Sequence, residues 1–166
     1  MRPVTIALLL ALATGISGCA SKFKTYNGPE VTRVVVMKGE RRMHLLHHDK
    51  VLNSYDFDLG FAPVGDKQVE GDGKTPEGRY FIDRRNPNSQ FHLSVGISYP
   101  NENDIREALE LGKRPGGDIF IHGAPNGRAR AKLAADWTAG CIAVTNKEIE
   151  RIYAMVRDGT PIDIYP

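Results

Sequence analysis

The chain has 166 residues, of which 41% are hydrophobic, and this suits one globular domain with a real core but hardly two. Its 22 Lys and Arg residues against 20 Asp and Glu residues give a net charge of +2. A charge so close to neutral gives no support to nucleic acid as a partner.

The N-terminus has the pattern of a secretory leader. Arg2 precedes an apolar run, Val4–Ile16, that is too short to span a bilayer. The ISGC segment that follows resembles a bacterial lipobox, in which cleavage before the cysteine leaves Cys19 as a lipidated first residue. We therefore expect a signal peptide over residues 1–18 and a lipid anchor at Cys19, on the periplasmic face of the bacterial envelope. The absence of aspartate after Cys19 favours the outer membrane. An ordinary signal peptide with an incidental Cys19 is the alternative.

Residues 19–30 are polar and contain Gly-Pro, so we expect a tether there and one domain over residues 31–166. Loss of Arg2 with the leader would lower the net charge to 2 − 1 = +1. With Cys19 used for lipid, Cys141 is the only other cysteine of the sequence. An unpaired thiol is a liability in an oxidising compartment. Cys141 is therefore a nucleophile, a buried packing residue or the partner of Cys19 in a disulfide.

Short segments with period-two alternation and many β-branched or aromatic residues follow from residue 31, and they predict strands in hairpins. A long loop rich in Gly, Asp and Pro interrupts them between residues 63 and 78. The predicted strands are 31–38, 41–47, 50–60, 79–84, 91–97, 117–123, 141–144 and 161–165.

Two segments have a helical pattern. In the first, residues 103–112, Asn103 can cap, Gly112 can end the helix, and the apolar residues favour one side. In the second, residues 145–159, Thr145 and Glu148 have the capping-box spacing and apolar residues recur at helical intervals up to Val156. A third, weaker helix is predicted through residues 127–136. Because strands outnumber helices and do not alternate with them, the expected fold is mainly β: an antiparallel β-sandwich with packed helices.

Cys141 stands between Gly140 and the strand-like CIAV segment, so a tight turn would present its sulfur at a strand edge. The glycine lets a substrate carbonyl approach, and the amides of Gly140 and Cys141 could stabilise an oxyanion. A cysteine nucleophile also needs a base. His122 is the best candidate, because it ends an apolar strand and is followed by the small Gly123.

The remaining histidines and the glycine-rich loop have simpler explanations. His44, His47 and His48 would suit a metal only on a helix, whereas the pattern predicts a strand with His47 on the opposite face. His92 is expected at the edge of the core. The GDGKTPEG segment lacks the spacing and context of a phosphate loop, so we expect a turn-rich surface lip. We expect no cofactor and no metal.

IHG followed by TAGC resembles the signature of the L,D-transpeptidase catalytic domain, a histidine followed after about fifteen residues by S/T-x-G-C. Here Gly123 to Trp137 separate His122 from Thr138. The upstream DGKTPEGRY is similar to the T-P-x-G-x-[FY] stretch of the same family. The resemblance covers essentially residues 31–165 and implies the β-sandwich of that family.

The resemblance implies that Cys141 attacks a carbonyl of a peptidoglycan stem peptide and that His122 is its base and later its proton donor. It places the main-chain carbonyl of Gly123 against the imidazole, the oxyanion donors at Gly140 and Cys141, and Thr138 in the role of holding the turn. An amine would resolve the acyl-enzyme by forming a crosslink or attaching a lipoprotein. Water would resolve it by hydrolysis.

The sequence departs from the commonest motif, S-H-G-C-[IV]-R, at two positions. Ala139 replaces the usual histidine and Ala143 the usual arginine, which removes a charge expected near substrate. GCIAVTN and VGISYPNENDIREA resemble a divergent subgroup that includes the enzyme detaching murein lipoprotein from peptidoglycan. Transfer and hydrolysis both stay open, with stem peptides or a peptidoglycan-linked lipoprotein as partners. The non-enzymatic alternative is a peptidoglycan-binding lipoprotein that keeps the fold.

Overall fold

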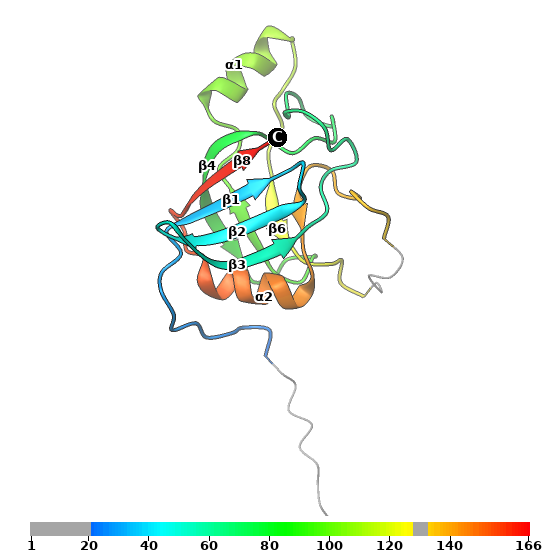
Figure 1. The fold of residues 1–166 in the computed structure, drawn as a ribbon. Coiled ribbons are helices and arrows are strands. Elements are labelled where there is room, and N and C mark those ends of the chain that lie inside the picture. The colour runs from blue at the N-terminus through cyan, green and yellow to red at the C-terminus, as the bar shows by residue number, and fades with distance from the viewer. Residues whose placement is uncertain (1–20, 128–132) are drawn as a thin grey trace, which may run out of the picture.

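One curled sheet forms the frame of the computed structural model, which describes residues 21–127 and 133–166 (Figure 1). Within these residues the sheet has eight strands, in the order β3-β2-β1-β8-β4-β5-β6-β7. Neighbouring strands are antiparallel except for the pairs β1 with β8 and β6 with β7, which are parallel. The strands are β1 (Arg33–Met37), β2 (Arg42–His47), β3 (Lys50–Asp56), β4 (Gly78–Asn86), β5 (Ser94–Ile97), β6 (Phe120–His122), β7 (Ile142–Ala143) and β8 (Pro161–Tyr165).

The predicted mainly β fold is confirmed, and each predicted strand segment overlaps one observed strand. The two layers of the expected sandwich are the halves of one sheet, joined by the long strand β4. Its residues 78–81 pair with β8 and its residues 82–86 pair with β5, and the β4–β5 register shifts between Ile82 and Arg84. The sheet therefore curls at β4 and brings its two faces together.

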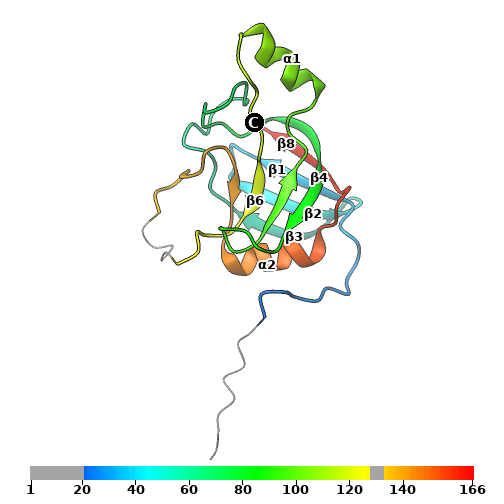
Figure 2. The same cartoon turned by 180° about the vertical axis from the view of Figure 1, so that it is seen from behind.

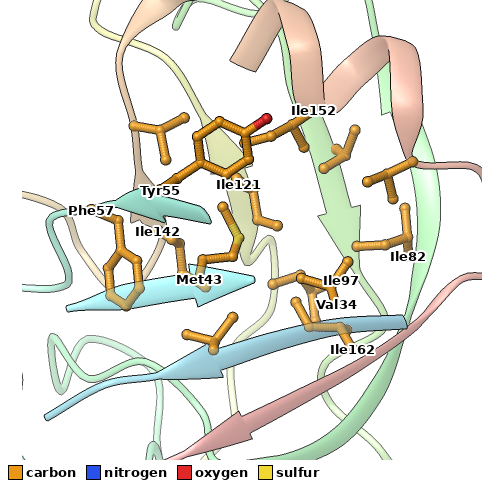
Figure 3. Close-up of a cluster of buried hydrophobic side chains, with 14 of the residues drawn as sticks. Val34, Met43, Tyr55, Phe57, Ile82, Ile97, Ile121, Ile142, Ile152 and Ile162 are labelled. Carbon is orange, nitrogen blue, oxygen red and sulfur yellow. The ribbon is translucent and has the colours of Figure 1, made fainter. Parts of the chain in front are cut away.

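The space inside the curl is filled by aliphatic side chains from both halves of the sheet (Figure 3). Val34 and Met43 of one half meet Ile97, Ile121 and Ile142 of the other half, and all five are fully buried. Burial of each such side chain contributes about 1.5 to 3 kcal/mol. This apolar filling fixes the distance between the halves and so the position of strands β6 and β7.

Helix α2 (Asn146–Met155) covers one end of the curled sheet (Figures 1 and 2). Its predicted capping box is confirmed, because the Thr145 side chain accepts from the Glu148 amide and the Glu148 carboxylate accepts from the Thr145 amide. Ile149 and Ile152 are fully buried against the sheet. Only two residues separate the end of β7 from the start of α2, so the helix directly follows the short strand after Cys141.

Helix α1 (Glu102–Glu110) projects from the opposite end of the sheet (Figure 2). The predicted cap at Asn103 was wrong: Asn101 caps the helix and forms a capping box with Asp104. The capping role of Asp104 was not predicted. Its buried carboxylate accepts from the Asn101 amide and from the Tyr80 hydroxyl, a contact that the local sequence pattern does not reveal. The apolar side of this helix is not a core face, since Ile105 is 41% exposed.

The predicted helix over residues 127–136 lies partly outside the described residues. Residues 133–136, which the structure does describe, are not helical. Among the described residues no helix is long and apolar enough to cross a membrane. Cys19 and the predicted leader, residues 1–18, also lie outside them, so both stay predictions.

The chain after β3 joins the two edges of the curled sheet. Asp58 and Ala143 exchange two backbone hydrogen bonds of 2.9 and 2.8 Å. Farther along, the Phe61 amide donates to the Thr138 carbonyl at 2.9 Å, and the Thr138 amide donates to the Leu59 carbonyl at 3.1 Å. Residues 58–61 therefore form a short seam against residues 138–143, which include the predicted nucleophile.

Gly60 lies at the tightest point of this seam. A Cβ there would lie 2.0 Å from the Gly73 carbonyl oxygen and 2.8 Å from the Gly140 amide nitrogen, and both contacts are with backbone. No side chain can move aside to make room. The seam can close only with glycine at this position.

Gly60→Ala is therefore expected to lower the free energy of unfolding by about 1 to 3 kcal/mol and to displace the turn before Cys141. Thermal unfolding and the rate of Cys141 alkylation by iodoacetamide measure the two effects. Gly39→Ala is the matched control, because a Cβ at Gly39 meets the Pro166 carbonyl oxygen only at an ordinary 3.6 Å. Equal behaviour of the two variants would contradict the role of the seam.

Candidate active site

Cys141 and His122 come from neighbouring parallel strands. Ile121 pairs with Ile142 and His122 with Ala143, which puts the side chains of residues 122, 143 and 141 on one face of the sheet. Cys141 immediately precedes β7. Cys141 and His122 both line a cavity of about 570 Å³, here called the catalytic cavity. The structure thus brings together the two residues that the sequence analysis selected.

His122 is buried, with 3% of its surface exposed, and is oriented by its own backbone. Its Nδ1 lies 2.7 Å from the carbonyl oxygen of Gly123. A carbonyl only accepts, so Nδ1 carries the hydrogen and Nε2 keeps its lone pair. Burial lowers the pKa of His122, although the hydrogen bond to Gly123 opposes the shift. The imidazole is therefore neutral and able to accept a proton at neutral pH.

Two aromatic rings pack against this imidazole. The Phe91 ring lies 4.5 Å from the His122 ring, centroid to centroid, and the Trp137 ring lies 5.5 Å from it. Phe91 and Trp137 also contact each other at 5.9 Å. Together they shield the imidazole from water and account for its burial.

Cys141 is a partly exposed free thiol among the described residues. Its sulfur donates to the Asp118 carbonyl oxygen at 3.5 Å, so the thiol proton points toward a main-chain acceptor. Burial of the thiol raises the pKa of Cys141 above its usual value. At neutral pH Cys141 is therefore a thiol, and His122 at the same cavity is a neutral imidazole.

The turn before Cys141 is held by two hydroxyl groups. Thr138 Oγ1 donates to the Cys141 carbonyl at 2.7 Å and accepts from the Gly140 amide at 3.2 Å. Thr75 Oγ1 donates to the Gly140 carbonyl at 2.8 Å. Gly140 has a φ of +129°, and a Cβ there would lie 2.6 Å from the Lys74 carbonyl oxygen. Of the two expected oxyanion donors, Gly140 is thus engaged within the turn, which leaves the Cys141 amide for substrate.

A second cavity of about 550 Å³ lies on the other side of the turn, here called the Arg114 cavity. Ala139, which replaces the usual histidine, lines it together with Lys67 and Arg114. Asp118 lines both cavities. The segment that accepts the Cys141 hydrogen bond therefore stands between two spaces that a peptide could occupy.

Several residues that shape the site were not selected from the sequence. The GDGKTPEG loop is more than a surface lip, because Thr75 is fully buried and contacts the nucleophile turn. Asn146 Oδ1 accepts from the Ala124 amide at 2.8 Å, just beyond His122. A Cβ on Gly123 would meet the same oxygen at 2.6 Å. Of the residues that shape the site, only Trp137 could have been noticed in the sequence, because it is the only tryptophan and lies just before the TAGC motif.

The histidines outside the site have local partners. His44 Nδ1 lies 2.8 Å from Ser54 Oγ, and His47 Nδ1 lies 2.8 Å from the Glu30 carbonyl oxygen. His92 lies before β5 in the left-handed region, with φ +70°, and its Nε2 lies 2.9 Å from Glu150 Oε1. Among the described residues no group of three or more His, Cys, Asp or Glu side chains could hold a metal ion.

Comparison with known proteins identifies the family. Residues 31–164 match the family model of the L,D-transpeptidase catalytic domain, which is most of the chain. The chain belongs to this family. It is 27% identical to YafK of Escherichia coli K12, which carries the L,D-transpeptidase name, over 98% of this chain and 65% of that protein. The chain therefore spans about two thirds of the length of this relative.

Solved structures agree with the L,D-transpeptidase fold. Pgp2 of Campylobacter jejuni, a helical cell shape determining protein, is 28% identical with a TM-score of 0.63, over 84% of this chain and 49% of Pgp2. Bd1075 of Bdellovibrio bacteriovorus is 25% identical with a TM-score of 0.56, over 82% of this chain and 48% of Bd1075. An L,D-transpeptidase of Mycobacterium smegmatis, at 15% identity and a TM-score of 0.54, shares the fold. This chain spans about half of each of the first two.

The directions of the two pKa shifts predict the pH dependence of acylation. His122 accepts a proton only when neutral, and its lowered pKa keeps it neutral below pH 6.5, the usual value. The raised pKa of Cys141 keeps the thiol protonated above its usual range. Acylation by a carbapenem, followed by intact-mass spectrometry, should therefore lose rate only below about pH 6.5.

His122→Ala is the control for this profile. It should slow acylation at neutral pH by roughly a hundredfold. It should also abolish the acid limb of the profile, which is the fall in acylation rate at low pH. An acid limb of the wild-type enzyme at or above the usual histidine pKa would contradict the neutral resting pair.

Proposed function

We propose that the protein acts on peptidoglycan stem peptides as a cysteine acyltransferase, through a thioester on Cys141 with His122 as base. The observation that carries the proposal is the pairing of β6 with β7, which brings the two side chains to one cavity. The tautomer fixed by the Gly123 carbonyl supports it, since Nε2 is the nitrogen left to accept a proton.

The reaction can be written with these groups alone. The Cys141 sulfur attacks the peptide carbonyl carbon as its proton passes to His122 Nε2, and the Cys141 amide donates to the developing oxyanion. The C–N bond then breaks, and the departing amine takes the proton from His122. An incoming amine or water gives a proton to His122 and attacks the thioester. The sulfur leaves and recovers that proton.

Water is the second candidate acceptor, with a donor whose stem peptide is already joined to another peptide or protein. The observation that favours it is Ala143, which is 2% exposed and stands on the face of Cys141 and His122, where the motif has arginine. A charge-assisted hydrogen bond at such a site contributes about 1.5 to 3 kcal/mol. Loss of that bond weakens selection for a free peptide carboxylate by roughly one to two orders of magnitude.

The cations near the reaction do not replace this arginine. Lys67 and Arg114 line the Arg114 cavity, but Lys67 lies 2.9 Å from the Asp72 carboxylate and Arg114 lies 2.7 Å from the Glu70 carboxylate. Both charges are thus already paired. A peptide bond in place of a free carboxylate needs no cation, which favours a linked donor.

We also propose that the protein acts at the periplasmic face of the envelope and is anchored to the outer membrane through lipid on Cys19. The support is the lipobox-like ISGC sequence after a short apolar run. A non-catalytic peptidoglycan-binding lipoprotein is the competing function, and the loss of the motif histidine and arginine at Ala139 and Ala143 supports it.

Incubation with purified muropeptides tests the choice of donor. Full-length protein is incubated with free tetrapeptide muropeptides and with muropeptides linked to a peptide or to a lipoprotein, and products are read by mass spectrometry. We expect the linked species to be cleaved with water faster than new crosslinks form. Formation of new L,D-crosslinks from tetrapeptides, with the linked species left uncleaved, would contradict this expectation and would show that transfer is the main activity.

Cys141→Ser is the control for this experiment. The hydroxyl beside His122 is a far weaker nucleophile than the thiol, so turnover should vanish while the melting curve stays that of the wild type. Binding of muropeptides without turnover by the wild-type protein would instead establish the binding module.

Cys19→Ala tests the anchor. The lipid chain is the expected source of membrane affinity, so the variant should be released from the membrane fraction or accumulate unprocessed. Fractionation with immunoblotting measures this, and conversion of Cys141 to alanine in the same assay is the matched control. Recovery of processed Cys19→Ala protein in the membrane pellet would disprove the anchor.

A further inference from the structure

The first residues that the structure describes lie against the protein rather than extending away from it. Residues 21–26, here called the N-terminal strap, have no helix or strand. Lys24 lies 3.2 Å from the Glu150 carboxylate of α2, and the Phe23 ring lies 6.3 Å from the Tyr153 ring of the same helix. Tyr26 packs against the hydrophobic core. The strap therefore has a defined position across α2.

Lys22 connects the strap to the loop between β4 and β5. Its Nζ donates to the Pro87 carbonyl at 2.7 Å and to the His92 carbonyl at 3.1 Å. These two carbonyls stand near opposite ends of the loop, residues 87–93, so one ammonium group bridges its two ends. Hydrogen bonds to an ionised donor are roughly twice as strong as neutral ones.

The same loop is held by its histidine side chain. His92 Nε2 lies 2.9 Å from Glu150, which also binds Lys24 of the strap. Burial raises the pKa of Glu150, but hydrogen bonds from His92 and Lys24 outweigh it and hold that pKa below its usual value. Glu150 is thus ionised at neutral pH and joins the strap, the helix and the loop.

The loop carries the ring that covers the catalytic imidazole. Phe91 stands next to His92, its ring lies 4.5 Å from His122, and its carbonyl accepts from the Gly123 amide at 3.0 Å. Ser89, Gln90 and Phe91 line the catalytic cavity. The chain of contacts thus runs from the strap through Lys22 and the loop to His122.

We propose that the N-terminal strap is a positioning element for the reaction, in which Lys22 holds the β4–β5 loop closed so that Phe91 stays packed on His122. The proposal rests on the proposed roles of His122 and Cys141. Lys22 is a positioning residue, because it touches neither substrate nor the reacting atoms.

A merely structural strap would change stability alone, whereas a positioning strap changes the surroundings of His122. With Lys22 removed, the loop keeps its hydrogen bonds to Asn126 and Gly123 but loses the bridge between its two ends, so it should loosen and admit water to the imidazole. His122 would then become easier to protonate. Cys141 and Asp118 are the other titratable side chains that line the catalytic cavity, and the substitution of Lys22 removes neither.

Lys22→Met in the full-length protein tests this, because it removes the donor and keeps the unbranched stem. Trp137 is the only tryptophan and lies 5.5 Å from the His122 ring, so its fluorescence reports directly on this cluster. We expect stronger quenching by acrylamide. We also expect the acid limb of carbapenem acylation to move upward by about half a pH unit or more.

Three further variants serve as comparisons for Lys22→Met. Lys22→Arg should restore both readouts in large part, because it restores a charged donor. Glu150→Ala should shift them in the same direction through His92. Lys50→Met, an exposed lysine of β3, should leave both unchanged.

The fluorescence readout does not depend on peptidoglycan chemistry, so failure of the strap and failure of the proposed function are distinguishable. If the wild type fails to react with muropeptides or carbapenem, the quenching comparison still tests the strap. Wild-type quenching and an unmoved acid limb in Lys22→Met, with or without a lower melting temperature, would overturn the proposal.

Discussion

The backbone seam between residues 58–61 and 138–143 is the constraint on which the site depends. A curled sheet has two free edges, and here the chain after β3 pairs with the chain around β7 through the hydrogen bonds of Asp58 and Ala143. The nucleophile turn is part of that closure. Because the turn is held between the Gly60 backbone and the Thr75 hydroxyl, the position of Cys141 is set by segments far away in sequence. A change that opens the edge therefore moves the nucleophile even when it leaves the core intact.

The core and the seam determine different parts of the geometry. Apolar packing between the two halves of the sheet fixes where β6 and β7 lie, and their parallel register puts His122 and Cys141 on one face. The direction of each reacting group is then set by single hydrogen bonds. The Gly123 carbonyl selects the tautomer of His122, and the Asp118 carbonyl receives the thiol. Apolar packing has no preferred direction, whereas hydrogen bonds do. Packing can therefore set the distance between strands, and hydrogen bonds set the orientation of individual groups.

The strands and the α2 capping box were predictable because their signals are local: alternation along a strand and a residue pair three positions apart. That Cys141 and His122 lie at one cavity was predictable from residue type, glycine context and the family motif. Phe91, Thr75 and Asn146 were not, because each acts through a contact with residues distant in sequence that no spacing reveals. Helix α1 shows the opposite error. Its apolar residues fit a helical face, but Leu109 is 66% exposed, since the helix projects beyond the sheet that such a face would need.

The resting state of the pair explains how a lone thiol can persist in the oxidising compartment that we propose. The thiolate, not the thiol, reacts with oxidants and alkylating agents. Burial raises the pKa of Cys141 and lowers that of His122, so at neutral pH the thiol and the neutral imidazole predominate. In the mechanism that we propose, a bound peptide changes this balance, because its carbonyl carbon takes the sulfur's electron pair as His122 takes the proton. The Cys141 amide donates to the oxyanion at the same moment. The free protein thus holds its thiol in the less reactive form, and the rings of Phe91 and Trp137, which pack on the imidazole, contribute to this restriction.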